Sequence, residues 1–326
     1  MSGPLSTGKR GASEPDAERR ERLLAALRRP LLYDGSKGVY LSAALPAVGR
    51  PPSDVSEWLN ILSPQVVRRM HCEYVDAGAQ IIQTNTFNAN RLRLEAHGLG
   101  DRVREVNVAA ARLAREAAGE DVLVAGAMGP SGKLLAMGEV AEQSLVDAFA
   151  EQAAALAEGG VDLFHAETMA DLAEARAAVE GVRRVPDLPL LLTMSFDTGK
   201  PEDLRTMMGV TPAQLVQAAD EMGVFGVGAN CGRGPEGYQE VVGALAQARP
   251  RAVLVAKFNA GIPRMEGRQV VYDGTPESMA AYALWCAENG VGIIGGCCGT
   301  TPRHIEAMAR ALLGRTGSFG PVGNGS

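Results

Sequence analysis

The sequence predicts an α/β fold, a (β/α)8 TIM barrel in a single domain. Eight apolar runs of strand length recur along the 326-residue chain, and a segment with helical spacing follows each of them. The runs are continuously apolar, which is typical of parallel strands buried on both faces. Eight strand-then-helix units are the number that closes a barrel, and the chain length falls within the usual range of that fold.

The expected elements alternate without interruption. In chain order the strands are expected at residues 31–33, 80–83, 122–127, 161–166, 190–194, 225–229, 253–256 and 291–294. The helices after the first four strands are expected near residues 64–77, 102–118, 145–157 and 171–182, and the fifth begins after Thr211. No change in composition divides this body, so one domain is expected over residues 31–313.

Both ends of the chain differ from the body. Residues 1–30 form a polar extension with a charged helix near residues 16–28, which either docks on the barrel or stays solvated, and a solvated tail is the favoured interpretation. Residues 314–326 are rich in Gly and Ser, which is typical of a flexible tail.

Composition excludes several classes of protein. A net charge of -6 and a pI near 5.4 argue against a nucleic-acid partner, which requires a basic face. No apolar run approaches the ~20 residues of a membrane-spanning helix, and the N-terminus lacks the apolar core of a secretory signal. Five cysteines in no spaced framework agree with a reducing compartment. We therefore expect a cytoplasmic protein without a membrane partner.

The most informative stretch is GGCCGTTP, which follows the last expected strand and contains Cys297 and Cys298. Adjacent cysteines are poor disulfide partners, because a bridge needs Cα atoms several Å apart, but they are good metal ligands. Zinc in proteins is usually tetrahedral, so a third ligand must come from elsewhere. Cys231 ends the sixth expected strand, whereas Cys72 and Cys286 lie in helical patterns where cysteine is usually a small buried hydrophobe. The sequence therefore predicts a Zn²⁺ site at Cys231, Cys297 and Cys298, with the fourth position open to substrate.

Other polar residues also fall at strand ends, which meet at one rim of such a barrel. They are Asp34, Thr84, Asn85, Glu167 and Asn230. A zinc ion lowers the pKa of a bound thiol and so favours a thiolate, and the usual biological electrophile for such a sulfur is a methyl group. Carboxylates at Asp34 and Glu167 are suited to an ammonium group. Together these residues indicate an amino-acid thiol such as homocysteine.

Six motifs resemble those of the zinc-dependent homocysteine S-methyltransferase family. They are GGCCGTTP, GANCG around Cys231, TNTF from Thr84, AETM around Glu167, MGPSG from Met128 and DG at Asp34. The family includes betaine-homocysteine methyltransferase and the homocysteine module of cobalamin-dependent methionine synthase. The resemblance covers residues 31–313 and implies a barrel enzyme in which three cysteines hold zinc, homocysteine sulfur is the nucleophile and methionine is the product.

By matching position, the resemblance implies that Asp34, Gly35, Thr84 and Glu167 bind the amino-acid end of homocysteine, and Asn85 and Asn230 complete the expected substrate-binding set. Within the family, the chain is most similar to bacterial betaine-type proteins. It departs from the family pattern after Asp34-Gly35, where the run is Ser36-Lys37-Gly38-Val39-Tyr40.

The methyl donor stays open at this point. A betaine-like onium compound is favoured, and Tyr33, Tyr40, Phe87 and Phe196 are candidates to bind its cation through their rings. S-methylmethionine and a methylated corrinoid protein are the alternatives, and a corrinoid protein is therefore a possible partner.

Two other interpretations compete with methyl transfer. Lys257 at the end of the seventh strand is suited to a Schiff base in an aldolase-like enzyme. Alternatively, the cysteines belong to a closed structural zinc site in a binding or thiol-sensing module. At the level of single residues, Asp34 and Glu167 are also suited to helix capping, and His165 is interpreted as a core histidine.

Overall fold

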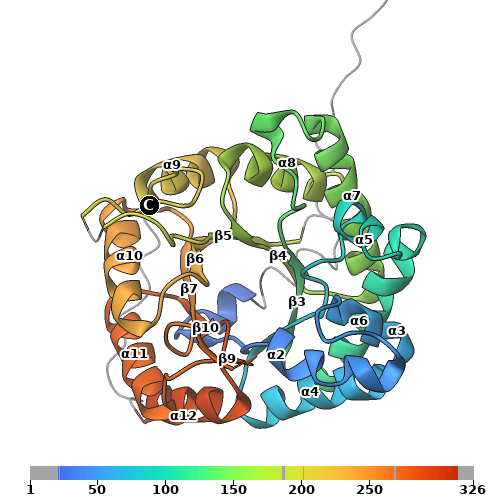
Figure 1. The fold of residues 1–326 in the computed structure, drawn as a ribbon. Helices are drawn as coiled ribbons and strands as arrows, with labels where there is room; N and C mark the ends of the chain where they lie inside the picture. The colour runs from blue at the N-terminus through green and yellow to red at the C-terminus, as the bar shows by residue number, and fades with distance from the viewer. Residues whose placement is uncertain (1–20, 22, 186–187, 201, 268, 315–326) are drawn as a thin grey trace, which may run out of the picture.

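A computed structural model of the chain describes residue 21 and residues 23–185, 188–200, 202–267 and 269–314. Eight parallel strands form one sheet in the order β1-β10-β7-β6-β5-β4-β3-β2. A further parallel bridge between Tyr33 and Ile81 joins the two ends of this sheet, so the strands close into a barrel. Figure 1 looks along the barrel axis, with the strands at the centre and the helices around them.

The eight expected strands are confirmed, with small differences at their ends. They are β1 (Leu31–Leu32), β2 (Ile81–Gln83), β3 (Leu123–Met128), β4 (Leu163–Met169), β5 (Leu190–Met194), β6 (Gly226–Asn230), β7 (Val253–Phe258) and β10 (Ile293–Gly296). The fourth and seventh strands extend beyond the expected ends, so Glu167 and Lys257 lie within strands. Both side chains are therefore held by strand backbone and not by a loop.

Eight longer helices surround the strands among the described residues. They are α4 (Pro64–Asp76), α6 (Val103–Ala118), α7 (Glu142–Gly159), α8 (Leu172–Val182), α9 (Pro212–Met222), α10 (Pro235–Gln247), α11 (Pro276–Glu288) and α12 (Pro302–Leu313). Five of these helices begin with proline, whose fixed φ suits the first helical position. The hydroxyls of Thr211 and Thr275 accept N–H groups of α9 and α11, which fixes where these helices start.

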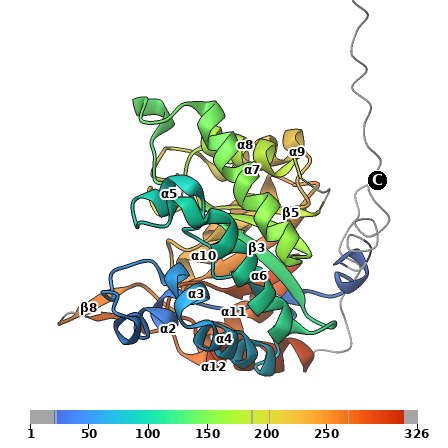
Figure 2. The same ribbon diagram turned by 90° about the vertical axis from the view of Figure 1, so that its right-hand side faces the viewer.

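The sequence did not predict an antiparallel hairpin between β7 and α11. It consists of β8 (Arg264–Glu266) and β9 (Gln269–Val271). All three β8 residues are exposed, so this strand lacks the alternation of apolar and polar residues by which a half-buried strand is recognised in a sequence. The short helices α2 (Gly38–Ser42), α3 (Leu59–Leu62) and α5 (Arg91–Glu95) were likewise not predicted. In Figure 2 the hairpin projects from one end of the barrel and the first described residues lie at the other end.

The described part of the N-terminal extension belongs to the barrel core. Leu23 and Leu27 are 1% and 7% exposed, and they pack with Leu31, Tyr33 and other inward-facing residues of the strands. The expectation of a solvated tail is therefore wrong for these two residues, whose apolar side chains close the N-terminal end of the barrel. Residues 1–20 and 22, and the expected flexible tail at 315–326, lie outside the described residues. The domain boundaries stay predictions.

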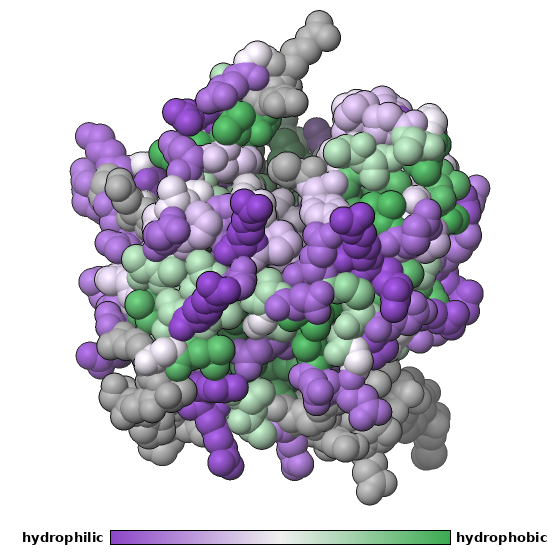
Figure 3. Space-filling model, turned by 90° about the horizontal axis from the view of Figure 1, so that it is seen from below, coloured by the Kyte–Doolittle hydropathy of each residue, from purple (hydrophilic) through white to green (hydrophobic). Residues whose placement is uncertain are grey.

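The side of the barrel that Figure 3 shows is largely polar. In the side view of Figure 3, hydrophilic side chains are interspersed with smaller hydrophobic areas, as expected for helices that bury one face. Among the described residues, no helix is long and apolar enough to cross a membrane.

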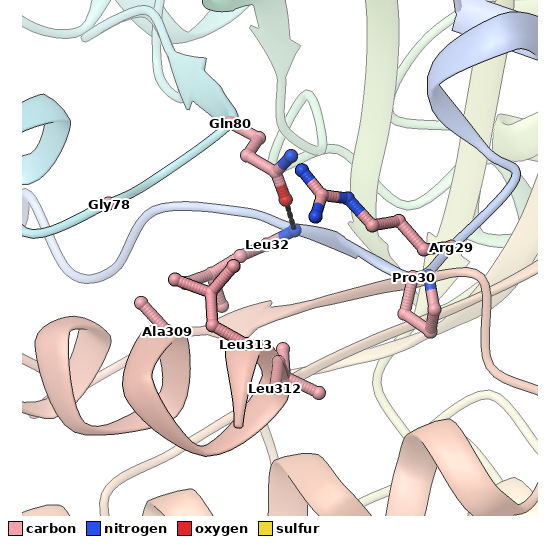
Figure 4. A pocket seen from close by; sticks show the side chains of 8 residues that line it. All are labelled: Arg29, Pro30, Leu32, Gly78, Gln80, Ala309, Leu312 and Leu313. Atoms are coloured by element: carbon pink, nitrogen blue, oxygen red, sulfur yellow. Dashed lines mark hydrogen bonds between the residues drawn. The ribbon is translucent and has the colours of Figure 1, made fainter. Parts of the chain in front are cut away.

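A pocket at the N-terminal end of the barrel lies between α12 and the starts of β1 and β2 (Figure 4). Its lining includes Leu32, Gly78, Leu312 and Leu313, and the Gln80 side chain accepts the N–H of Leu32 there. The pocket is at the opposite end of the strands from their carboxyl ends, where active sites of this fold form.

Candidate metal centre

Cys231, Cys297 and Cys298 meet at the carboxyl ends of β6 and β10. Their sulfur atoms all lie within 4.8 Å of one another, and the Cys231 and Cys298 sulfurs are 3.8 Å apart. Two thiolates bound to one tetrahedral zinc at ~2.3 Å stand about 3.8 Å apart, so the observed spacing fits such an ion. In the part of the chain that the structure describes, these three cysteines are the one group of three or more His, Cys, Asp or Glu side chains close enough together to hold a metal ion. The cysteine cluster can therefore bind a metal, and no fourth His, Cys, Asp or Glu among the described residues joins it, whereas a structural zinc site requires a fourth ligand.

Backbone hydrogen bonds to β7 and the segment after it hold the three cysteines in place. The N–H groups of Cys231 and Cys297 donate to the carbonyls of Lys257 and Phe258, at 3.1 and 2.6 Å. The N–H of Cys298 donates to the Asn259 side chain at 3.1 Å. Cys231 has a φ of 62°, which is unusual for a residue other than glycine and is typical of functional positions held by their surroundings. The sulfur geometry is thus imposed by the strand ends.

The three thiols influence one another's protonation. Hydrogen bonds from the Cys297 and Cys298 thiols lower the pKa of Cys231 to about 3. The hydrogen bond with Cys231 raises the pKa of Cys297 to about 11, and it also raises the pKa of Cys298. The three thiols therefore do not lose their protons independently of one another. A divalent cation would hold all three as thiolates, because metal ligation displaces thiol protons.

Asn230, predicted as a substrate contact, connects the sulfurs to the neighbouring strands. Its Oδ1 accepts the Thr168 N–H at 2.8 Å and the Thr193 hydroxyl at 2.6 Å. Its Nδ2 donates to the Thr168 hydroxyl at 2.6 Å and lies 3.8 Å from the Cys297 sulfur. Thr168 has a φ of 59° and lies at a register shift between β4 and β5. Each polar atom of the Asn230 amide is thus occupied, and the side chain acts as a support for Cys297.

Asn230→Ala is expected to lower metal affinity about 10- to 100-fold, the usual effect of removing a hydrogen bond to a metal ligand. Competition with a chromogenic chelator of known affinity measures this directly. Asn289→Ala, on the exposed C-terminus of α11, is the matched control and should leave affinity unchanged. An unaltered affinity in the Asn230 variant would show that its amide does not support the metal ligands.

A buried charged network lies beneath the sulfurs. Glu167 is 6% exposed and accepts a hydrogen bond from the Gln83 amide. The Lys257 ammonium is 3.7 Å from Glu167, donates to the Gln83 carbonyl oxygen, and lies 3.9 Å above the Tyr33 ring. Burial raises the pKa of Glu167, and the nearby Lys257 opposes this shift. The Lys257 side chain is 3% exposed and enclosed by Glu167, Gln83 and the Tyr33 ring, so a carbonyl substrate has little access to its nitrogen, which argues against the aldolase interpretation.

His165 lies in the same network as a core histidine, as expected. It is fully buried, its Nδ1 is 3.2 Å from the Tyr33 hydroxyl and its Nε2 is 2.9 Å from the Thr193 hydroxyl. Burial, with a further contribution from Lys257, lowers its pKa.

Asp34 lies at the end of β1, fully buried and paired with Lys37. The loop that contains them is fixed to the cysteine motif, because Ser36 N–H donates to the Thr300 hydroxyl at 3.0 Å. Gly35 allows this approach, since a Cβ there would lie 2.5 Å from the same hydroxyl. Asp34 and Glu167 do not cap the helices that follow them. The N-cap residue of α2 is Lys37, and that of α8 is Asp171.

Thr84 and Asn85, also predicted as substrate contacts, are engaged elsewhere. The Thr84 hydroxyl accepts the Ala127 N–H at 3.0 Å, and the Asn85 amide bonds with Ser56 and Asn60. Gln83, which sequence reasoning missed, is the β2 residue that contacts Glu167 and Lys257. The alternation of side chains along β2 is the signal that distinguishes Gln83 from Thr84, once the strand register is known.

The aromatic residues considered for an onium donor are only partly accessible. Tyr33 and Phe196 are 0% and 2% exposed, and the Lys257 ammonium already occupies one face of the Tyr33 ring. These two residues therefore do not present a free ring to a donor. Phe87 and Tyr40 are half-buried, and the Tyr40 hydroxyl donates to Glu73.

The family model described as homocysteine S-methyltransferase matches residues 31–312. The methionine synthases of Mycobacterium tuberculosis and Mycobacterium leprae are each 32% identical over 299 residues, or 87% of this chain. The chain spans only about a quarter (25% and 24%) of the length of these relatives.

Solved structures of the homocysteine methyltransferase MmuM from Escherichia coli have the same fold. The oxidised form has a TM-score of 0.71 at 25% identity, and the metallated form has a TM-score of 0.71 at 24% identity. Each alignment covers 89% of this chain and 98% of the MmuM chain.

Proposed function

The chain belongs to the homocysteine S-methyltransferase family, and we propose that it transfers a methyl group to the sulfur of homocysteine to give methionine. The observation that carries this proposal is the convergence of the Cys231, Cys297 and Cys298 sulfurs within 4.8 Å. Buried carboxylate and ammonium groups lie beside them, as binding of a zwitterionic amino acid requires. A purely structural metal site needs no such groups.

The cofactor proposed for the cysteines is Zn²⁺, because three thiolates in a tetrahedral arrangement suit that ion. When bound, zinc supplies a Lewis acid that lowers the pKa of a substrate thiol. The homocysteine thiol loses its proton to solvent, and a sulfur electron pair forms the new bond to the methyl carbon. The bond between that carbon and the donor atom breaks, and its electron pair stays on the donor.

The chain's own residues orient the amino acid and hold the ligands. Glu167 accepts the substrate ammonium, because its lysine partner is 3.7 Å away, whereas the lysine partner of Asp34 is 2.9 Å away. Asn230 and Asn259 keep Cys297 and Cys298 in position through side-chain contacts. All five cysteines are free, which supports the reducing, cytoplasmic compartment that we propose.

The donor is either a small onium compound such as betaine or S-methylmethionine, or a methylated corrinoid protein. Exposed apolar side chains on three loops that follow β3, β5 and β7 favour a large donor. They are Met137, Met207, Ile262 and Met265, each at least 67% exposed. All four lie on segments that follow strands at the end of the barrel where active sites of this fold form, so they are candidate contacts for a partner.

Methionine formation from homocysteine tests the proposal with betaine, S-methylmethionine and methylcobalamin as alternative donors. Activity with one of them, lost on chelation and restored by Zn²⁺, is the expected result. Methylation by none of the three donors, in a protein with its metal bound and homocysteine present, would refute the proposed function.

A further inference from the structure

Lys37 occupies the carboxylate that was expected to bind the substrate ammonium. Its Nζ lies 3.1 Å from Oδ1 and 2.9 Å from Oδ2 of Asp34. Asp34 Oδ2 also accepts the Gln83 N–H at 2.9 Å. Since Asp34 is fully buried, its charge is already balanced and its acceptor positions are taken within the chain.

The charges beneath the sulfur cluster therefore form two pairs. Asp34 pairs with Lys37 at 2.9 Å and Glu167 with Lys257 at 3.7 Å. Lys37 is close enough to the second pair that Lys257 and Glu167 both influence its pKa, which burial lowers. An amino acid brings one ammonium and one carboxylate, so it needs one anionic and one cationic partner. Glu167 is the more loosely paired anion, and Lys37 and Lys257 are the candidate cations.

Of the two lysines, Lys37 is the better placed to meet a ligand. Its side chain is 12% exposed, whereas that of Lys257 is 3% exposed and is enclosed by Gln83, Glu167 and the Tyr33 ring. An ammonium has three N–H donors. Two of them serve the oxygens of Asp34, and the third contact, to the Gly35 carbonyl, is long at 3.4 Å. This third donor is the one available to an incoming anion.

The loop that carries Lys37 is fixed to the loop that carries the cysteines. The Tyr74 hydroxyl lies 2.6 Å from the Ser36 carbonyl oxygen and 3.1 Å from that of Thr300. Thr300 in turn donates to the Cys297 carbonyl at 2.6 Å. The ammonium of Lys37 and the sulfurs therefore belong to one rigid framework, as recognition of both ends of a short substrate requires.

We propose that Lys37, held by Asp34, binds the α-carboxylate of the thiol amino acid and so determines which thiols the site accepts. Glu167 binds the ammonium, and the cysteine site receives the sulfur. This assignment rests on the proposed function and is an alternative to the expectation that Asp34 contacts the substrate ammonium. Asp34 becomes a positioning residue for Lys37.

The decisive experiment measures binding of three thiols by calorimetry to the metal-loaded full chain and to Lys37→Met. The thiols are homocysteine, 4-mercaptobutanoate, which lacks the amine, and 3-mercaptopropylamine, which lacks the carboxylate. In Lys37→Met, binding of 4-mercaptobutanoate is expected to weaken about 10- to 100-fold, the range for a hydrogen bond to a charged group. Binding of 3-mercaptopropylamine should not weaken, because it has no carboxylate.

Three controls separate this effect from a general disturbance of the site. Lys37→Arg keeps the charge and should retain most of the affinity for 4-mercaptobutanoate. Lys133→Met replaces an exposed lysine and should change nothing. Bound metal should be stoichiometric in every variant.

Unchanged binding of 4-mercaptobutanoate in Lys37→Met would overturn the assignment. If that variant instead bound only 3-mercaptopropylamine more tightly, Lys37 would be a competitor of the substrate ammonium for Asp34, and the assignment would also be wrong. Failure of the unaltered protein to bind homocysteine would instead overturn the proposed function, and this inference with it.

Discussion

Cys298→Ala is expected to purify without bound metal and to lose at least about 100-fold in methyl transfer to homocysteine. Its sulfur is 3.8 Å from that of Cys231. Without it, only Cys231 and Cys297 remain as protein ligands of the proposed metal. Zinc bound by a full set of protein ligands gains roughly 10 kcal/mol or more of binding free energy. With one thiolate fewer, this binding free energy falls, and we expect the metal to dissociate during purification. Metal analysis of the purified variant measures the first effect, and methionine formation measures the second.

Cys72→Ala is the matched control, because Cys72 is another free cysteine but lies on α4, away from the cluster. It should keep one metal per chain and full activity. Chelation of the unaltered protein should abolish activity, and added Zn²⁺ should restore it, whereas neither treatment should change the activity that remains in Cys298→Ala. One tightly bound metal per chain in Cys298→Ala would remove this residue from the ligand set.

The barrel could be predicted because its strands are apolar on both faces and its helices start at recognisable caps. The runs at 190–194 and 253–256 contain little besides apolar residues. The hairpin of β8 and β9 escaped prediction because short exposed strands bury nothing and leave no pattern. Leu23 and Leu27 were assigned to a polar tail, because two apolar residues among many charges show no burial until the open end of the barrel is seen.

The cluster of Cys231, Cys297 and Cys298 could be predicted because adjacent cysteines at a strand end have few structural explanations. The residues around them could not, because their roles depend on which way each side chain points. Thr84 and Gln83 are neighbours, yet only Gln83 reaches Glu167. Likewise, Lys37 was visible as a departure from the family pattern, but its pairing with Asp34 depends on the conformation of the loop. Sequence patterns identify chemical groups, whereas pairing among buried charges requires coordinates.

Lys257→Met is expected to be the most destabilising single change in the charged network. Lys257 is 2% exposed, and removal of its ammonium leaves Glu167 as a buried carboxylate without its ion-pair partner. Breaking a buried ion pair from one side typically costs about 3–5 kcal/mol. Loss of the contact with the Tyr33 ring adds to this, since a desolvated cation over an aromatic face contributes up to about 2 kcal/mol. Urea unfolding at equal metal loading measures the difference in free energy of unfolding.

The double variant Lys257→Met/Glu167→Gln distinguishes a charge effect from a packing effect. Removal of the carboxylate charge eliminates the unpaired anion, so the double variant should be more stable than Lys257→Met alone. A double-mutant cycle gives the interaction free energy, which should be favourable for residues in contact. Lys200→Met, at an exposed position, should stay within about 0.5 kcal/mol of the unaltered protein. If the two network substitutions proved additive instead, the 3.7 Å approach of Lys257 to Glu167 would carry no energetic coupling, and the ammonium would serve packing alone.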